Sequence, residues 1–325
     1  MKEKKNFFDM MQALDRRWIY LIVALAIIIP LLIPFNSRTD TTEPSENVYK
    51  MIDSFSGKSN KAILLCVSHD ASTMAELFPM EVSILRHCFE RNIKVFSICF
   101  SPTSAPLVDY AINTAKEDFP DIKSGEDYCN FGYKSASLFL PILLGMGEDI
   151  ANIVETDAEG RKIANLEIMK DIRNYDDMNL IIDFSASGSV FSWVTYARVK
   201  FGANVAAGVT AVMAADNYPY LQSGQLIGML AGLKGAAEYE KMVDVFAVQG
   251  RNFSKEVISE TRVPITGDHE LYGNKIPMRF KKARIGMNAQ SVAHIMMIVF
   301  IILGNIGYFV TRKKKGQEEL CHLKL

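Results

Sequence analysis

Cysteine is scarce in this chain, and its spacing matches no metal site. There are five cysteines among 325 residues, namely Cys66, Cys88, Cys99, Cys129 and Cys321. No two of them have the CxxC spacing, and no group of cysteines and histidines resembles a zinc site, which excludes the common zinc-binding modules. Because Cys66 and Cys99 lie in apolar runs, we expect buried thiols there. The even number of cysteines before residue 130 leaves disulfides open.

An excess of charge and the common catalytic signatures are also lacking. The formal net charge is −1, and no basic face of the kind that binds nucleic acid is evident, so nucleic acid is not expected as a partner. The glycine patterns GxGxxG and GxxxxGK[ST], which cradle nucleotide phosphates, are absent, as are HExxH and GxSxG. We therefore expect no cofactor and no metal, and no reaction follows from the sequence.

Two long apolar runs, at residues 18–35 and 291–311, dominate what is present. The first carries no charged side chain, and the second carries none apart from the usually neutral His294. An α-helix needs about 20 apolar residues to cross the ~30 Å hydrocarbon core of a bilayer. The sequence therefore predicts two transmembrane helices and a lipid bilayer as partner.

Basic residues at both ends predict that both termini are cytoplasmic. Lysine and arginine are concentrated before residue 18 and again at residues 312–315, and positive flanks are retained in the cytoplasm. The domain between the runs is then extracytoplasmic. Basic residues at 275–284 oppose this orientation, but a large domain tolerates such charge, and we expect it to lie on anionic lipid headgroups. A cleaved signal peptide is the alternative for the first run, although no small-x-small cleavage site follows it.

The two runs divide the chain into six segments. We expect a cytoplasmic basic tail at 1–17, a transmembrane helix at 18–35, a polar linker at 36–47, an extracytoplasmic α/β domain at 48–290, a second transmembrane helix at 291–311 and a second cytoplasmic basic tail at 312–325.

The central domain alternates strand patterns with helix patterns. Continuous apolar runs predict strands that are buried on both faces, at 61–68, 92–100, 179–184 and 204–212. Amphipathic spacing predicts helices at 72–91 and 190–200, with weaker signals at 107–116 and 135–144. Such strand–helix–strand units form mostly parallel sheets with helices on both faces, so we expect a Rossmann-like α/β fold.

Three glycines recur at every fourth position, at Gly224, Gly228 and Gly232. On one helix they would form a glycine face, and we expect that face to pack closely on the sheet or on a partner subunit. Glycine inside a helix costs up to about 1 kcal/mol relative to alanine, so a close approach would have to compensate. The alternative is that part of this run is a loop.

Polar residues follow the expected strands at the edge where open α/β sheets bind ligands, beyond the strand carboxyl ends. The candidate ligand-binding residues are His69, Asp70 and Ser72 after the first strand, Ser185, Ser187 and Ser189 after the third, and Asp216, Tyr218 and Gln222 after the fourth. Together they predict a polar crevice.

Simpler interpretations exist for two of these groups. His69 and Asp70 are either a general base with its orienting carboxylate or, as their adjacency favours, a loop histidine and a helix cap. The SASGS run at 185–189 would offer backbone amides to an anion at a helix N-terminus, without matching a nucleotide-binding motif.

Three segments carry a resemblance to a known family. They are AAGVTAVMAADNYPYLQSGQLIGMLAGLKGAAEYE at 206–240, LLGMGEDI at 143–150 and GNIGYF at 304–309. Together they resemble a family of uncharacterised membrane-anchored prokaryotic proteins, some of them labelled predicted regulators of amylopullulanase. The resemblance implies a membrane anchor and a link to extracellular polysaccharide breakdown. It implies no catalytic or binding residue.

Two functions from different classes remain open. The first is a non-enzymatic, membrane-anchored binding, scaffold or regulatory domain, with a membrane or extracytoplasmic protein, or a second copy of the chain, as partner. The second is an extracytoplasmic, hydrolase-like enzyme with its site at the strand ends. The enzyme hypothesis requires the polar groups at those ends to converge on a concave pocket. A transport role is disfavoured, because two spans without intramembrane charge form a poor pathway.

Overall fold

The computed structural model describes residues 15–37, 39–58 and 60–322. The chain forms two compact units, one made of Asn36–Arg284 and the other of Met1–Phe35 together with Ile285–Leu325. The first unit holds all the strands in the part of the chain that is described.

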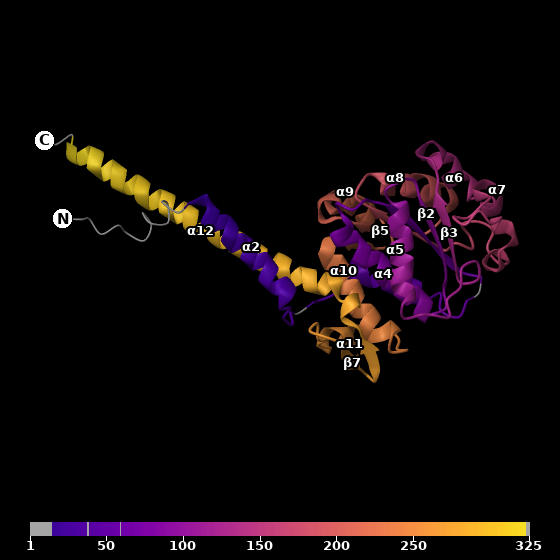
Figure 1. Ribbon diagram of the computed structural model, residues 1–325. Helices are drawn as coiled ribbons and strands as arrows, with labels where there is room; N and C mark the ends of the chain where they lie inside the picture. Colours follow the sequence, from indigo (N-terminus) through magenta and orange to yellow (C-terminus); the bar gives the residue numbers. More distant parts are fainter. Residues whose placement is uncertain (1–14, 38, 59, 323–325) are drawn as a thin grey trace. The chain divides into compact units, whose positions relative to one another are not determined.

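A six-stranded parallel sheet is the centre of the first unit (Figure 1). Its strands are β1 (Ala62–Ser68), β2 (Lys94–Cys99), β3 (Tyr128–Tyr133), β4 (Leu180–Ser185), β5 (Val205–Val209) and β6 (Met229–Ala231), in the order β3-β2-β1-β4-β5-β6. This is the strand order of the doubly wound nucleotide-binding folds. The prediction of a parallel α/β fold is confirmed.

The sequence missed the two edge strands, β3 and β6, for a physical reason. Central strands such as β1 are buried along almost their whole length and therefore appear as continuous apolar runs. Strand β3 alternates buried with partly exposed positions and includes Asn130 and Gly132, while β6 has only three residues. The predicted strand at 204–212 is also too long, because β5 ends at Val209 and a helix begins at Ala211.

Helices connect the strands. They are α3 (Glu43–Asp53), α4 (Met74–Glu90), α5 (Ala105–Lys116), α6 (Phe139–Gly145), α7 (Ile150–Val154), α8 (Ser189–Trp193), α9 (Ala211–Gln222), α10 (Gly232–Met242) and α11 (Lys255–Glu260). Helices α8 and α10 continue as π-helical turns, η4 (Val194–Val199) and η5 (Val243–Ala247). Single 3-10 turns are η1 (Ala136–Leu138), η2 (Ile163–Asn165), η3 (Glu167–Met169) and η6 (Met278–Phe280). A separate two-stranded hairpin pairs β7 (His269–Leu271) with β8 (Asn274–Ile276).

The linker predicted at 36–47 is shorter than expected, because α3 begins inside it at Glu43. Pro44 occupies the first helical turn, where a missing N–H is harmless. Ser45 and Glu46 are buried although their side chains are polar. The α/β unit therefore begins before residue 48.

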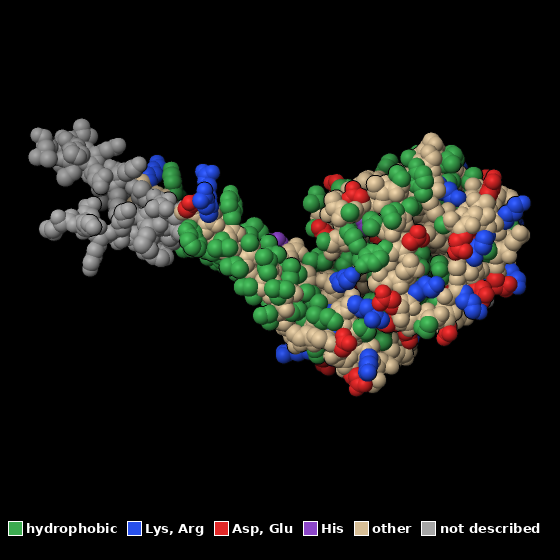
Figure 2. Space-filling view, viewed as in Figure 1, with side chains coloured by type: hydrophobic (Ala, Val, Ile, Leu, Met, Phe, Trp, Pro, Cys, Tyr) green, Lys and Arg blue, Asp and Glu red, His purple; other side chains and the backbone are tan. Residues whose placement is uncertain are grey.

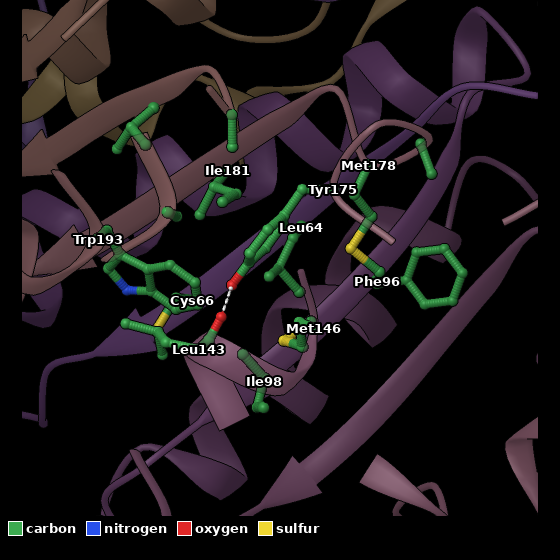
Figure 3. Close-up of a cluster of buried hydrophobic side chains, with 14 of the residues drawn as sticks. Leu64, Cys66, Phe96, Ile98, Leu143, Met146, Tyr175, Met178, Ile181 and Trp193 are labelled. Carbon is green, nitrogen blue, oxygen red and sulfur yellow. Dashed lines mark hydrogen bonds between the residues drawn. The ribbon is translucent and has the colours of Figure 1, made fainter. Parts of the chain in front are cut away.

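Helices cover both faces of the sheet. On one face, Leu65 and Val67 of β1 lie against Leu85 of α4 and Val108 of α5. On the other face, Figure 3 shows a cluster of buried side chains that includes Leu64 and Cys66 of β1, Ile181 of β4 and Trp193 of α8. The hydroxyl of Tyr175 donates a hydrogen bond to the carbonyl oxygen of Leu143 (2.7 Å) within that cluster. Adjacent β1 residues thus point into two different cores.

The predicted glycine-faced helix is wrong, and the loop alternative is confirmed. Gly224 lies in the turn after α9 with φ 72°, Gly228 immediately precedes β6, and Gly232 begins α10 with φ 58°. Close packing does occur at Gly228, where an added Cβ would lie 2.4 Å from the carbonyl oxygen of Pro44 and 2.7 Å from Val48 Cγ2. That glycine therefore allows α3 to approach the edge of the sheet.

The second unit contains two apolar helices, α2 (Arg16–Leu32) and α12, which runs over Lys282–His322 and so begins in the first unit. Among the described residues, one helix is long and apolar enough to cross a membrane, the 29 residues Lys282–Val310. The first apolar run forms a helix of 17 residues, because the helix ends at Leu32 rather than at residue 35. Two membrane crossings are therefore not shown by the structure. Many large apolar side chains of both helices are exposed, and Figure 2 shows hydrophobic side chains on their surface.

Candidate functional site

The sheet order places its topological switch point between β1 and β4. From β1 the chain crosses to β2 on one side, and from β4 it crosses to β5 on the other. Cys66 pairs with Asp183, and Ser68 pairs with Ser185. Because alternate residues of a strand share a face, these four side chains lie together on one face of the sheet. Ligands of doubly wound sheets bind at the carboxyl ends of the strands at this point.

Asp183 is the most unusual group at the switch point. It is fully buried in β4, where its Oδ2 accepts a hydrogen bond from Ser189 Oγ (2.5 Å), and its Oδ1 has no partner among the described residues. Burial raises the pKa of Asp183 to about 6, and the hydrogen bond from Ser189 only partly opposes this. The core around Asp183 thus moves the titration of this carboxyl group from the acidic range towards neutral pH.

The serine loop after β4 is closed by its own hydrogen bonds. Ser185 Oγ accepts from the backbone N–H of Ser187 (2.9 Å), and Ser189 Oγ lies 2.8 Å from it. Ser187 is exposed, whereas Ser185 is buried. The amide of Ser187, which the sequence suggested for anion binding, is therefore already bonded to a side chain of the same loop.

His69 is buried and paired with a carboxylate that the sequence did not suggest. Its Nε2 contacts Glu81 Oε1 of α4, and its Nδ1 lies 3.2 Å from the carbonyl oxygen of Asp70. Burial alone would lower the pKa of His69, but the hydrogen bond and charge of Glu81 outweigh it and raise that pKa. Both ring nitrogens have partners, so His69 is not placed to take a proton from Ser185 or Ser189.

Asp70 has the structural role that its position favoured. Its Oδ1 accepts hydrogen bonds from the backbone N–H (2.8 Å) and the hydroxyl (2.6 Å) of Ser72, which orders the turn before α4. These hydrogen bonds lower the pKa of Asp70. The side chain does not orient the ring of His69, whose carboxylate partner is Glu81.

The third predicted group does not lie on a loop. Asp216, Tyr218 and Gln222 are exposed positions within α9, the helix after β5. Thr210 Oγ1 begins this helix by accepting a hydrogen bond from the N–H of Met213 (3.4 Å). The expected loop position was wrong because the apolar run of β5 continues directly into an apolar first turn of helix. Two of the three predicted groups therefore follow neighbouring strands, and the third belongs to the surface of a helix.

Two polar groups near the switch point, Glu81 and Asp183, were absent from the predicted site. Asp183 interrupts an otherwise apolar strand, LIIDFS, and a carboxylate in a strand buried on both faces must be protonated or hydrogen-bonded. Glu81 lies between the buried Met80 and Val82 of α4. Each of these carboxylates lies within an apolar segment of the sequence, and this pattern could have identified both as candidate site residues.

A second polar cluster lies where α4, α10 and the first turn of α12 meet. Asp244 Oδ1 accepts hydrogen bonds from both terminal nitrogens of Arg86 (3.2 Å each), and Asp244 Oδ2 pairs with Arg284 Nη2. Glu240 accepts hydrogen bonds from the backbone N–H groups of Ala283 (2.9 Å) and Arg284 (3.0 Å). All four charged side chains are buried, and burial raises the pKa of Glu240 to about 7. We call Arg86, Glu240, Asp244 and Arg284 the buried ionic network.

No group of three or more His, Cys, Asp or Glu side chains that could hold a metal ion occurs in the described part of the chain. The 590 Å³ cavity of the α/β unit is lined by residues of other segments, not by the switch-point groups. The predicted polar residues therefore do not converge on this cavity. Comparisons with protein-family models, with curated proteins and with solved structures found no match to this chain.

Proposed function

We propose that this protein is a membrane-anchored, extracytoplasmic binding or regulatory protein, not an enzyme. The observation that carries this proposal is the apolar part of α12. Beyond its first turn, which belongs to the α/β unit, the apolar part at residues 285–310 extends for about 39 Å at 1.5 Å per residue, more than the ~30 Å of a hydrocarbon core. Only 6% of its most apolar window is buried within the protein, so a bilayer is the medium that would cover it.

The start of α12 is held by the α/β unit, which suits an anchor that positions a domain. Glu240 accepts the first free N–H groups of the helix, at Ala283 and Arg284, and a carboxylate there also interacts favourably with the helix dipole. Arg284 in turn contacts Asp244 of η5. The first turn of α12 is thus part of the α/β unit and is held there by buried polar contacts.

We propose α2 as a second anchor, with both chain termini in the cytoplasm. Its 17 residues extend for about 26 Å, and the apolar residues 33–35 that follow add to its reach. Basic residues before α2 and after the apolar part of α12 support this orientation. A domain attached to the membrane at both ends presents a defined surface to a neighbouring protein.

Binding is favoured over catalysis by the chemistry at the switch point. The nitrogen atoms of His69 contact Glu81 and a backbone carbonyl, and the serine hydroxyls bond to one another and to Asp183. A serine hydrolase needs a general base that can take a proton from its serine nucleophile. His69 is not in this position, because its two ring nitrogens contact Glu81 and a backbone carbonyl. A regulatory role would also agree with the resemblance to uncharacterised membrane-anchored proteins, some of them labelled predicted regulators of amylopullulanase. Purification of a lone monomer from mild detergent would argue against a protein partner.

The topology is tested by labelling cysteines from outside the cell. Ser223 is exposed after α9, so Ser223→Cys in a Cys321→Ser background should react with a membrane-impermeant maleimide in intact expressing cells. Native Cys321, in the basic C-terminal segment that we expect to be cytoplasmic, should react only after permeabilisation. The native thiols Cys66, Cys88, Cys99 and Cys129 are buried and should not react.

Extraction at alkaline pH completes the test. The full-length chain should remain in the membrane pellet. Recovery in the supernatant, or labelling of Ser223→Cys only in permeabilised cells, would contradict the proposal, because each requires a domain that is not held outside the membrane.

A further inference from the structure

The loop that leads into α11 carries an Asn-x-Ser tripeptide, Asn252-Phe253-Ser254 (Figure 1). Asn-x-Ser or Asn-x-Thr, with any residue except proline in the middle, is the acceptor pattern for N-linked glycosylation. No other asparagine of the 325-residue sequence is followed two positions later by serine or threonine. The pattern also arises by chance in many proteins, so its local structure decides whether this asparagine can serve as an acceptor.

The side chain of Asn252 is accessible and unbonded. Residues 251–254 lie outside helices and strands, and Asn252 is exposed. Among the residues that the structure describes, its side-chain amide has no hydrogen-bond partner. The side-chain nitrogen of Asn130, by contrast, donates to Asp109 Oδ1 (2.9 Å). An enzyme that modifies Asn252 can therefore take up its side-chain nitrogen without breaking a hydrogen bond of the fold.

The two residues that follow Asn252 hold the loop in place. The ring of Phe253 packs on the α/β unit, with its centroid 5.2 Å from that of Phe246 in η5. Ser254 Oγ accepts a hydrogen bond from the N–H of Val257 (3.4 Å) and so begins α11. Asn252 is thus the residue of the tripeptide that is left to solvent. A group attached to its side-chain nitrogen would extend away from the domain without displacing a core side chain.

We propose that Asn252 is N-glycosylated by an oligosaccharyltransferase, with an oligosaccharide bound to a lipid phosphate as the donor. In this transfer, Nδ2 of Asn252 forms a bond to the anomeric carbon of the first sugar. The bond between that carbon and the phosphate oxygen breaks, the lipid phosphate leaves, and one amide proton is lost. The proposal rests on the extracytoplasmic position proposed above, because this modification belongs to chains that have crossed a membrane.

A glycan at Asn252 would restrict where a partner protein can bind. It is bulky and hydrophilic, so it would cover the surface around the start of α11. Helix α3 borders this surface, because Lys50 Nζ lies 4.6 Å from the centre of the Phe253 ring. The proposed partner would then contact another face of the α/β domain.

Mass spectrometry of the full-length chain tests the proposal. Wild-type and variant proteins are purified in mild detergent from membranes of the cells that naturally produce the chain, and the peptide that contains residue 252 is weighed. We expect a mass excess of one oligosaccharide on this peptide, with complete loss in Asn252→Gln and in Ser254→Ala. Ser254→Thr should keep it, because threonine supplies the same hydroxyl group and also begins helices.

Asn165 provides two matched controls. It is exposed like Asn252 but does not belong to such a tripeptide, so Asn165→Gln should leave the mass excess unchanged. Glu167 is also exposed, and Glu167→Thr makes Asn165 the acceptor of a second tripeptide. That variant should gain a second oligosaccharide if the domain reaches the transferase. Matching circular dichroism melts of all variants establish that the fold is retained.

Three results would overturn the proposal. The first is an unmodified Asn252 in a Glu167→Thr chain that is modified at Asn165, which would leave the extracytoplasmic position of the domain standing. The second is the absence of the modification at both positions; labelling of Ser223→Cys from outside the cell then decides the position of the domain independently. The third is a mass excess that persists in Asn252→Gln, which would place the modification on another residue.

Discussion

At the scale of single residues, several buried charged groups of this protein are paired with partners that are not their neighbours in sequence. His69 meets Glu81 instead of its neighbour Asp70, and Arg86 meets Asp244 across 158 positions of chain. Burial then changes the chemistry of the carboxylates, because a charged group in a low-dielectric core is disfavoured. Asp183 and Glu240 both have raised pKa values for this reason.

Asp183 gives a prediction about pH. Its pKa rises from 3.8 in the unfolded chain to about 6 in the folded protein, so folding takes up a proton between these values. Its contribution to stability is therefore complete below about pH 4 and is lost as the pH rises to about 6. Asp183→Asn does not titrate and still accepts from Ser189. The variant should be more stable than the wild type by about 1–3 kcal/mol at pH 8 and equal to it at pH 4.

Thermal unfolding of both proteins across pH 4–8, followed by circular dichroism in mild detergent, measures this difference. The other carboxylates titrate in both proteins, so their contributions to the pH dependence of stability cancel in the difference. A difference that does not change with pH would show that Asp183 is not buried as a titrating group.

At the scale of elements, close approaches between helices and the sheet depend on individual glycines. Gly228 lies where α3 crosses the edge at β6, and its backbone approaches Pro44 and Val48. The sequence correctly indicated a close approach from the glycine spacing. It placed that approach on the wrong element, because three glycines at intervals of four fit a helix face and a turn–strand–helix succession equally well.

Gly228→Ala should destabilise the protein by about 2–4 kcal/mol. The new Cβ would meet the carbonyl oxygen of Pro44 at 2.4 Å, which belongs to backbone and can move only with α3. Gly188→Ala is the control, since nothing lies within 4 Å of its Cβ position and its φ is −80°. That variant should change the stability by less than about 0.5 kcal/mol. Melting temperatures of the two variants, measured together, test the close packing; equal values would refute it.

At the scale of the whole molecule, the packing of the first turn of α12 within the α/β unit depends on Asp244. This carboxylate is fully buried and contacts two arginines, Arg86 and Arg284. Asp244→Asn would remove the carboxylate that pairs with Arg86 and would leave Arg284 with Glu240 alone, 3.8 Å away. Breaking a buried pair in this way costs about 3–5 kcal/mol. Asp216→Asn, an exposed position on α9, should have little effect. The melting temperatures of the two variants in detergent test this prediction. If Asp244→Asn melts at the temperature of the wild type, the buried ionic network does not stabilise the fold.

The sequence by itself determined the fold class and the apolar segments. Four central strands and the helices after β1 and β4 were predicted because their signals are local: continuous apolar runs for strands buried on both faces, and apolar spacing along a helix. The edge strands β3 and β6 were not predicted. An edge strand is less completely buried than a central strand, so its sequence need not be a continuous apolar run. The start of α9 was missed because apolar residues continue from strand into helix without a break.

The tertiary structure alone decided which polar residues meet. Strand order brings β4 next to β1, so Asp183 lies beside Cys66 although 116 residues separate them along the chain. The same holds for Arg284 and Asp244, and for the cavity wall that joins the segment before α3 to the start of α12. Periodicity and composition report the environment of each segment. They carry no information about which distant segment supplies the partner, because pairing follows from the packing of the whole chain.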